Sequence, residues 1–181
     1  MRVFEIIGFV PSESYVMHDT INEFLNYVGK LNNLTNKQIS ERTQLFAKLF
    51  NLTNKLDYKF NTLSLGEQKK VMIIQSVLHD PEIIIMDEPT NALDNESLRE
   101  FTSFIKYLKE LNKTVIFSSH DINSINNFGV DKIIYISNGK IIKNDILDED
   151  VGARLNKYSK DNNDTPYVPT DIKTKSIYNK K

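Results

Sequence analysis

Two adjacent carboxylates, Asp87 and Glu88, directly follow the apolar run at 83–86 (IIIM). A short run of this kind predicts a buried strand, and its carboxyl end lies where open α/β sheets bind ligands. One carboxylate there can hold Mg²⁺, and its neighbour can act on a water as a general base. Acids also follow strands simply to begin a loop, so this pair alone leaves both interpretations open.

A second candidate site is the segment 63–68 (LSLGEQ). The unpaired backbone amides of a helix that begins with Ser64 and Gly66 predict an anion-binding site. Ser64 and Glu67 also have the spacing of a capping box, which would explain both residues without any ligand.

A third candidate is His120, which follows the apolar run at 114–118 (TVIFS). A histidine at the carboxyl end of a strand can reach a terminal phosphate, although a lone histidine more often has a structural role. The order of the three features connects them, because Ser64 lies 23 residues before Asp87 and His120 lies 32 residues after Glu88.

Strands and helices alternate around these residues, which predicts a mainly parallel sheet. Capping boxes at Thr20, Thr35 and Ser64 predict three helices, and in the second of them Ile39, Leu45 and Leu49 are expected to face inward. The predicted helices are 20–31, 36–50, 64–78, 95–111 and 121–128, and the predicted strands are 3–10, 82–86, 114–118, 132–137 and 140–144.

Composition predicts one domain over 1–150, with a helical subdomain at about 20–80, and a polar tail over 151–181. The tail has seven Lys or Arg and three Asp, a net charge of +4, and we expect it to be disordered. A contact between this basic tail and an anionic membrane surface is the alternative.

Bulk properties exclude several classes of protein. The formal net charge of −1 argues against a nucleic-acid partner, and the lack of cysteine excludes disulfides and thiolate metal sites. Apolar runs are too short to cross a bilayer, and the first residues lack a signal-peptide pattern, so we expect a cytoplasmic protein.

Over roughly residues 3–145 the chain resembles the ATP-binding-cassette (ABC) ATPases, because several motifs occur in that family's order and spacing. The segment 63–67 resembles the signature motif, with Leu65 and Glu67 as departures. The segment 83–88 resembles Walker B with the catalytic glutamate, 91–94 (NALD) resembles the D-loop, and His120 resembles the switch histidine.

The resemblance implies an α/β fold of the P-loop NTPase type, with helices on both faces of a layered sheet and a helical subdomain. It implies ATP and Mg²⁺ as cofactors. The implied catalytic residues are Glu88 and His120, the implied ATP-binding residues are Ser64, Gly66, Glu67, Asp87, Asp94 and Ser12, and the implied metal ligand is Asp87.

Two parts of the family pattern are missing or altered. No G-x-x-x-x-G-K-[ST] phosphate loop occurs in the 181 residues, so we expect an N-terminally truncated domain that binds ATP weakly by itself. By resemblance, the strand that feeds this loop lies between the strand ending at Ser118 and the strand at 132–137, and its loss predicts an opened sheet of marginal stability. Ser12 occupies the position of the Q-loop glutamine.

The predicted function is therefore an ATP-binding subunit of an ABC transporter, although hydrolysis by this chain alone is expected to be impaired. The implied partners are a transmembrane permease subunit and a second cassette, at the cytoplasmic face of the cell membrane. One alternative is a non-catalytic partner that offers its signature motif in trans, and another is a non-functional truncated product. A soluble cassette for DNA repair or translation is disfavoured, because long coiled-coil insertions and tandem cassettes are absent from the sequence.

Overall fold

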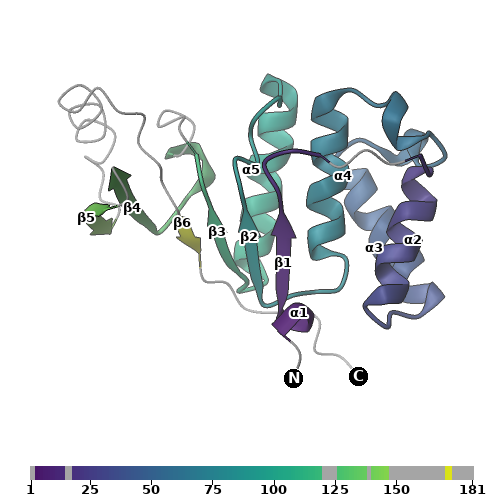
Figure 1. The fold of residues 1–181 in the computed structure, drawn as a ribbon, viewed down its shortest axis with the longest axis horizontal. Helices are drawn as coiled ribbons and strands as arrows, with labels where there is room; N and C mark the ends of the chain where they lie inside the picture. The colour runs from purple at the N-terminus through teal and green to yellow at the C-terminus, as the bar shows by residue number, and fades with distance from the viewer. Residues whose placement is uncertain (1–2, 15–17, 120–125, 138–139, 147–169, 173–181) are drawn as a thin grey trace.

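The structure is a computed structural model that describes residues 3–14, 18–119, 126–137, 140–146 and 170–172. Its sheet has the spatial order β1-β2-β3-β6-β4-β5 (Figure 1). The strands β1, β2 and β3 are parallel, which confirms the predicted parallel sheet for this half, whereas β4 and β5 form an antiparallel hairpin. The strands are β1 (Ile7–Val10), β2 (Ile83–Met86), β3 (Thr114–Phe117), β4 (Lys132–Ser137), β5 (Lys140–Ile146) and β6 (Thr170–Ile172).

Three of the helices begin at the predicted capping boxes. The side chains of Thr20, Thr35 and Ser64 each accept a hydrogen bond from the backbone N–H three residues later, and the Glu or Gln at that position bonds back to the cap. This reciprocal pairing satisfies backbone donors that a helix start leaves free. The helices are α1 (Val3–Ile6), α2 (Ile21–Leu31), α3 (Asn36–Leu49), α4 (Leu65–Val77) and α5 (Asn95–Glu110), with 3₁₀ turns η1 (Thr53–Lys55), η2 (Phe60–Thr62) and η3 (Asn126–Phe128).

Two local predictions were wrong. Residues 3–6 form a helical turn rather than the start of a strand, and β1 pairs with β2 only from Ile7, opposite Ile83, although the Glu82 N–H still donates to the Ile6 carbonyl at 3.0 Å. In α3, Leu45 is 42% exposed and Phe46 is buried in its place. A helical period that starts from Ile39 returns to the core at positions 43, 46 and 47, and position 45 falls on the opposite side.

The parallel strands bury one face of the sheet more completely than the other. Gly8, Ile84 and Val115 are in register on the buried face, against which α4 and α5 pack. On the other face Ile85 is only half-buried and Phe9 is 50% exposed. Among the described residues, the sheet at β2 is therefore fully covered on one face only.

Close packing fixes α4 and α5 against this buried face. A Cβ on Gly8 would lie 2.0 Å from the carbonyl oxygen of Ser76, so α4 can approach β1 only because this residue is a glycine. Phe101 of α5 packs edge-on against Phe117 of β3, with ring centroids 6.2 Å apart. These contacts hold the strand ends that carry the candidate site.

The position between β3 and β4 is occupied by β6, which runs antiparallel to β3 (Figure 1). The resemblance assigns this position to the strand that feeds the phosphate loop. Residues 170–172 belong to the predicted tail, so a strand there was not foreseen. The other tail residues, and part of the predicted helix at 121–128, lie outside the described residues.

His79, which follows α4, makes the stability of the fold depend on pH. Its Nε2 lies 3.2 Å from the carbonyl oxygen of Ile7. Burial lowers the pKa of His79 below its ordinary value of 6.5, although the hydrogen bond to Ile7 and the charge of Asp80 partly offset this shift. The folded chain therefore binds fewer protons at this side chain than the unfolded chain does.

We predict that the free energy of unfolding falls as the pH is lowered from about 7 to 5. The contribution of His79 is fully present above its ordinary pKa of 6.5 and is lost as the pH falls through the lowered pKa. Urea titrations at several pH values should show a weaker pH dependence for His79→Gln. The exposed His18 provides the control, and an equal change of slope in His18→Gln would contradict the prediction.

Candidate functional site

The predicted carboxylates lie at the carboxyl edge of the parallel strands. Val10, Met86 and Phe117 are in register at the ends of β1, β2 and β3. Hydrogen bonds continue this register beyond the strands, since the Asp87 N–H donates to the Val10 carbonyl at 2.8 Å and the Ser118 N–H donates to the Met86 carbonyl at 3.0 Å. Asp87 and Ser118 are therefore held side by side by the backbone.

The Ser118 hydroxyl joins the two acidic residues. It donates to Oδ1 of Asp87 at 2.7 Å and accepts from the backbone N–H of Glu88 at 2.8 Å. Ser118 is only 2% exposed, so water does not readily replace these bonds. Glu88 has φ of 45°, a left-handed conformation that is unfavourable for a residue with a side chain. Ser118 thus helps to hold a strained backbone at the candidate general base.

Lys69 of α4 connects this edge to the segment after β1. Its Nζ donates to the carbonyl oxygens of Pro11 at 3.0 Å and Ser12 at 2.6 Å, although the residue is only 4% exposed. Burial lowers the pKa of Lys69, and the negative charges of Asp87 and Glu88 partly offset this effect. A buried cation therefore lies near both carboxylates and fixes the backbone at Ser12.

Sequence reasoning did not identify Lys69 or Ser118 as functional residues. Ser118 had a usable signal, because it is the polar end of an apolar strand that must lie beside the strand of Asp87. Lys69 had only the adjoining apolar run 71–74, which indicates a buried helix face but gives no reason for a lysine to be part of it.

The start of α4 combines Ser64, Gly66 and Glu67. The Glu67 N–H donates to the Ser64 hydroxyl at 3.3 Å, and Oε2 of Glu67 accepts from the Ser64 N–H at 3.0 Å. Burial raises the pKa of Glu67, but the ion pair with Lys55 and the bonds to Ser64 outweigh it and lower the pKa overall. The capping-box interpretation of Ser64 and Glu67 is confirmed, and it is compatible with a further role.

Gly66 brings the start of α4 against the loop after β2. A Cβ at this position would lie 2.8 Å from the carbonyl oxygen of Ala92, which itself has φ of 66°. Two residues later, Asp94 caps α5 and accepts from the Ser97 N–H at 2.8 Å. This backbone hydrogen bond lowers the pKa of Asp94. His120 lies outside the described residues.

The donor groups at this edge fit Mg²⁺ chemistry. Among the described residues no cluster of three or more His, Asp or Glu exists that could hold a metal ion unaided. Asp87 provides a carboxylate, which suits Mg²⁺ because this ion binds one or two carboxylates, keeps several waters and completes its shell with substrate phosphates. A bound Mg²⁺ would polarise a phosphoryl oxygen there.

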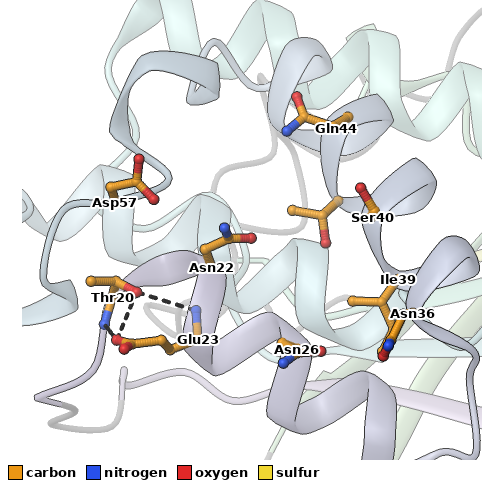
Figure 2. Close-up of a pocket in the computed structure, with 10 residues that line it drawn as sticks. Thr20, Asn22, Glu23, Asn26, Asn36, Ile39, Ser40, Gln44 and Asp57 are labelled. Carbon is orange, nitrogen blue, oxygen red and sulfur yellow. Dashed lines mark hydrogen bonds between the residues drawn. The ribbon is translucent and has the colours of Figure 1, made fainter.

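A polar groove of about 460 Å³ lies between α2 and α3, away from this edge (Figure 2). Figure 2 shows Asn22 and Asn26 of α2 facing Ser40 and Gln44 of α3. Thr43 is buried in the lining, and its hydroxyl has no hydrogen-bond partner. No helix in the described part of the chain has the length and apolar character needed to cross a membrane.

Comparisons with known proteins agree with these motifs. A family model described as ABC transporter matches residues 5–91. The ABC transporter ATP-binding protein NatA of Bacillus subtilis is 35% identical over 123 residues, 68% of this chain and 50% of NatA. A putative ABC transporter ATP-binding protein of Mycoplasma pneumoniae is 31% identical over 83% of this chain and 48% of its own length. The chain thus spans about half the length of the curated relatives it matches.

Solved structures agree on the fold. The structure of an ATP-binding subunit of an ABC transporter superimposes with a TM-score of 0.73 at 20% identity, covering 84% of this chain and 63% of the other. The cbiO1 protein of Clostridium perfringens is described as part of the ABC transporter complex cbiONQ. It superimposes with a TM-score of 0.69 at 25% identity, and the match covers 87% of this chain and 63% of cbiO1.

We predict that Ser118→Ala lowers the free energy of unfolding by about 1–3 kcal/mol, because the Glu88 N–H and Asp87 Oδ1 lose the hydroxyl between them. The control is Ser76→Ala, which removes a single bond to the Ile73 carbonyl from an equally buried serine. Denaturant unfolding should show a smaller loss for the control. Equal losses in both variants would show that Ser118 does not hold the two acidic residues.

Proposed function

The chain belongs to the ABC transporter family of ATP-binding domains, and on this premise we propose that it supplies the hydrolytic half of an ATPase site. The observation that carries the proposal is the carboxyl edge of β1–β3, where Ser118 holds Asp87 and Glu88 together and Lys69 fixes the backbone at Ser12. The substrate is ATP with Mg²⁺, and the role of the subunit is to couple its hydrolysis to transport across a membrane.

Each residue at this edge receives a role from its geometry and its motif. Glu88 acts as the general base that takes a proton from the attacking water. Asp87 holds Mg²⁺ directly or through water, since its Oδ1 is already oriented by Ser118. The remaining proposed nucleotide contacts, assigned by motif, are Ser12, Ser64, Gly66, Glu67, Asp94 and His120.

The phosphate grip has to come from a loop outside these residues. ABC ATPases wrap the phosphates with the amides and lysine of a P-loop, and no such motif occurs in residues 1–181. Without that loop, Asp87 and Glu88 act on a nucleotide that is not held in place. We therefore assign catalysis to a complex in which a P-loop-bearing segment completes the site.

The partners in this proposal are a transmembrane permease subunit and a second cassette, at the cytoplasmic face of the membrane. The groove between α2 and α3 is the surface that we assign to the permease. Its exposed amides and hydroxyls, together with the unpartnered hydroxyl of Thr43, offer hydrogen bonds to a docking segment. One solved relative, cbiO1, is described as part of a transporter complex.

We predict that the 181-residue chain alone binds Mg-ATP more weakly than micromolar and hydrolyses almost none. When it is assembled with a P-loop-bearing subunit, Glu88→Gln should lower ATP turnover at the completed site by about a hundredfold, because the general base is lost. The affinity for Mg-ATP should change little. Calorimetric titration and phosphate release measure the two quantities.

The matched control is Glu82→Gln, the same change at the opposite end of β2, where Glu82 is exposed. This variant should keep full turnover. Micromolar affinity of the unaccompanied chain for Mg-ATP would refute the need for an outside P-loop, and equal turnover of the two variants would remove Glu88 from the site.

The exposed start of α4 favours a second function, in which the chain offers its signature motif in trans to another cassette. Ser64 is exposed at the N-terminus of this 13-residue helix, and Leu65 beside it is 70% exposed. Helix N-terminal amides bind phosphate oxygens. In this function the chain would complete a partner's nucleotide site without any hydrolysis of its own.

We predict that Ser64→Arg lowers the ATPase activity of a co-purifying P-loop-bearing subunit by at least about tenfold, because the bulky side chain blocks the helix N-terminus. Thr35→Arg is the matched control, since it removes an equivalent capping box from α3 at a similar cost to stability. Equal activities of the two complexes would exclude a contribution of α4 in trans.

A further inference from the structure

The strand β6 is poorly suited to the central position that it occupies. It has three residues, and it pairs with β4 at a single position, Ile133 opposite Thr170. Pro169 directly precedes it, and Asp171 stands opposite Ile116 of β3. Aspartate is depleted in strands, and proline is confined to strand edges and starts, whereas a strand between two others is usually an apolar run.

The neighbouring strands can pair with a longer strand than β6. β3 has four residues and β4 has six, and both contribute fully buried side chains, Val115 and Ile133, next to this position. Backbone donors and acceptors that a central strand leaves unpaired cost free energy when they are removed from water. An apolar strand of about five residues would pair along both neighbours and satisfy more of these groups.

The direction of β6 matters for the candidate site. Because β6 is antiparallel to β3, its first residue, Thr170, lies opposite Phe117, at the edge that carries Asp87 and Ser118. The chain therefore enters the sheet at the site edge and leaves at the other end. Only a strand parallel to β3 would deliver the loop that follows it to the site edge.

The incompletely covered face of the sheet, which carries Phe9 and Ile85, offers room for an incoming segment larger than one strand. Phe9 and Ile85 lie in register on this face, and neither is fully covered by the described residues. A helix that follows a parallel strand crosses over one face of the sheet and packs on it. Ile116 of β3 is half-buried and in register with Ile85, so it extends this face to the strand next to β6. An apolar face that reaches an incompletely paired strand position fits a strand, loop and helix in succession.

We propose that β6 is a displaceable strand, and that the position between β3 and β4 accepts the apolar strand of the P-loop-bearing segment, which expels Thr170–Ile172 as it binds. The proposal rests on the proposed function for the identity of the incoming segment. It adds that the chain's own C-terminal residues compete with that segment. Assembly of the ATPase site is then controlled by exchange of one strand.

The test uses the full 181-residue chain and a synthetic peptide with an apolar strand, a Gly-x-x-x-x-Gly-Lys-Thr loop and a short amphipathic helix. Hydrogen exchange with mass spectrometry should show new protection at 114–117 and 132–137 and loss of protection at 170–172. Residues 21–31 of α2 should remain unchanged. A peptide of the same composition with two prolines in its strand should have no effect.

A variant separates exchange from simple addition. Asp171→Pro removes a backbone donor from β6 and weakens its hold, so the peptide should bind this variant at least about tenfold more tightly, or about 1.4 kcal/mol. Asn179→Pro, in the same C-terminal region but outside β6, is the matched control and should leave the affinity unchanged. The exchange measurement on the unaltered chain needs no variant and decides the matter if Asp171→Pro fails to fold.

Three results would overturn the proposal. The first is protection of β3 and β4 without loss of protection at 170–172, the second is equal peptide affinity of the two proline variants, and the third is the absence of new protection in every chain. Nucleotide binding is scored separately by titrating Mg-ATP into each complex. Strand exchange without Mg-ATP binding would support the displaceable strand and count against the proposed function. Mg-ATP binding without strand exchange would support the proposed function and count against the displaceable strand.

Discussion

The parallel register of β1, β2 and β3 is the constraint on which the candidate site depends. It aligns Val10, Met86 and Phe117, and the hydrogen bonds from Asp87 to Val10 and from Ser118 to Met86 extend the alignment past the strand ends. A shift by one residue would exchange the two faces of a strand and separate the Ser118 hydroxyl from Asp87. The chemistry of the edge is thus a consequence of backbone pairing.

The loops around this edge are held in unfavourable conformations by polar contacts. Glu88 and Ala92 both have positive φ, and a side chain at Gly66 would collide with the Ala92 carbonyl. Ser118 accepts a buried hydrogen bond from the Glu88 N–H, which offsets part of this strain. Strained residues that cluster at one edge of a sheet are typical of functional sites, where a fixed geometry is more useful than local stability.

The sheet is continuously paired from β1 to β3, whereas its pairing between β3 and β4 is incomplete. The half formed by β1, β2 and β3 has a well-packed face under α4 and α5, with Gly8 and Phe101 in close contacts. Beyond β3, the three residues of β6 join the hairpin of β4 and β5 through one pair. The carboxylates proposed to act in phosphate-bond cleavage lie in this half, and in the proposed assembly the groups that grip the phosphates are delivered at the position of β6.

Local sequence patterns by themselves determined most of the helices and the identity of the acidic pair. Capping boxes at Thr20, Thr35 and Ser64 were readable because each involves residues only three positions apart, and the run before Asp87 marked a buried strand. Helical spacing was harder to apply within 36–50, where Leu45 was assigned to the wrong side.

Only the tertiary structure decided what depends on contacts between distant segments. The pairing of Ser118 with Asp87, 31 residues apart, is indicated only by the polar residue at the end of an apolar strand. The pairing of Lys69 with Ser12, 57 residues apart, has no local signal. The same holds for β6, whose three residues (Thr170–Ile172) form a strand where they pair with the edge of β3. A backbone edge recruits a partner through hydrogen bonds that any residue except proline can make, and side-chain patterns therefore do not reveal it.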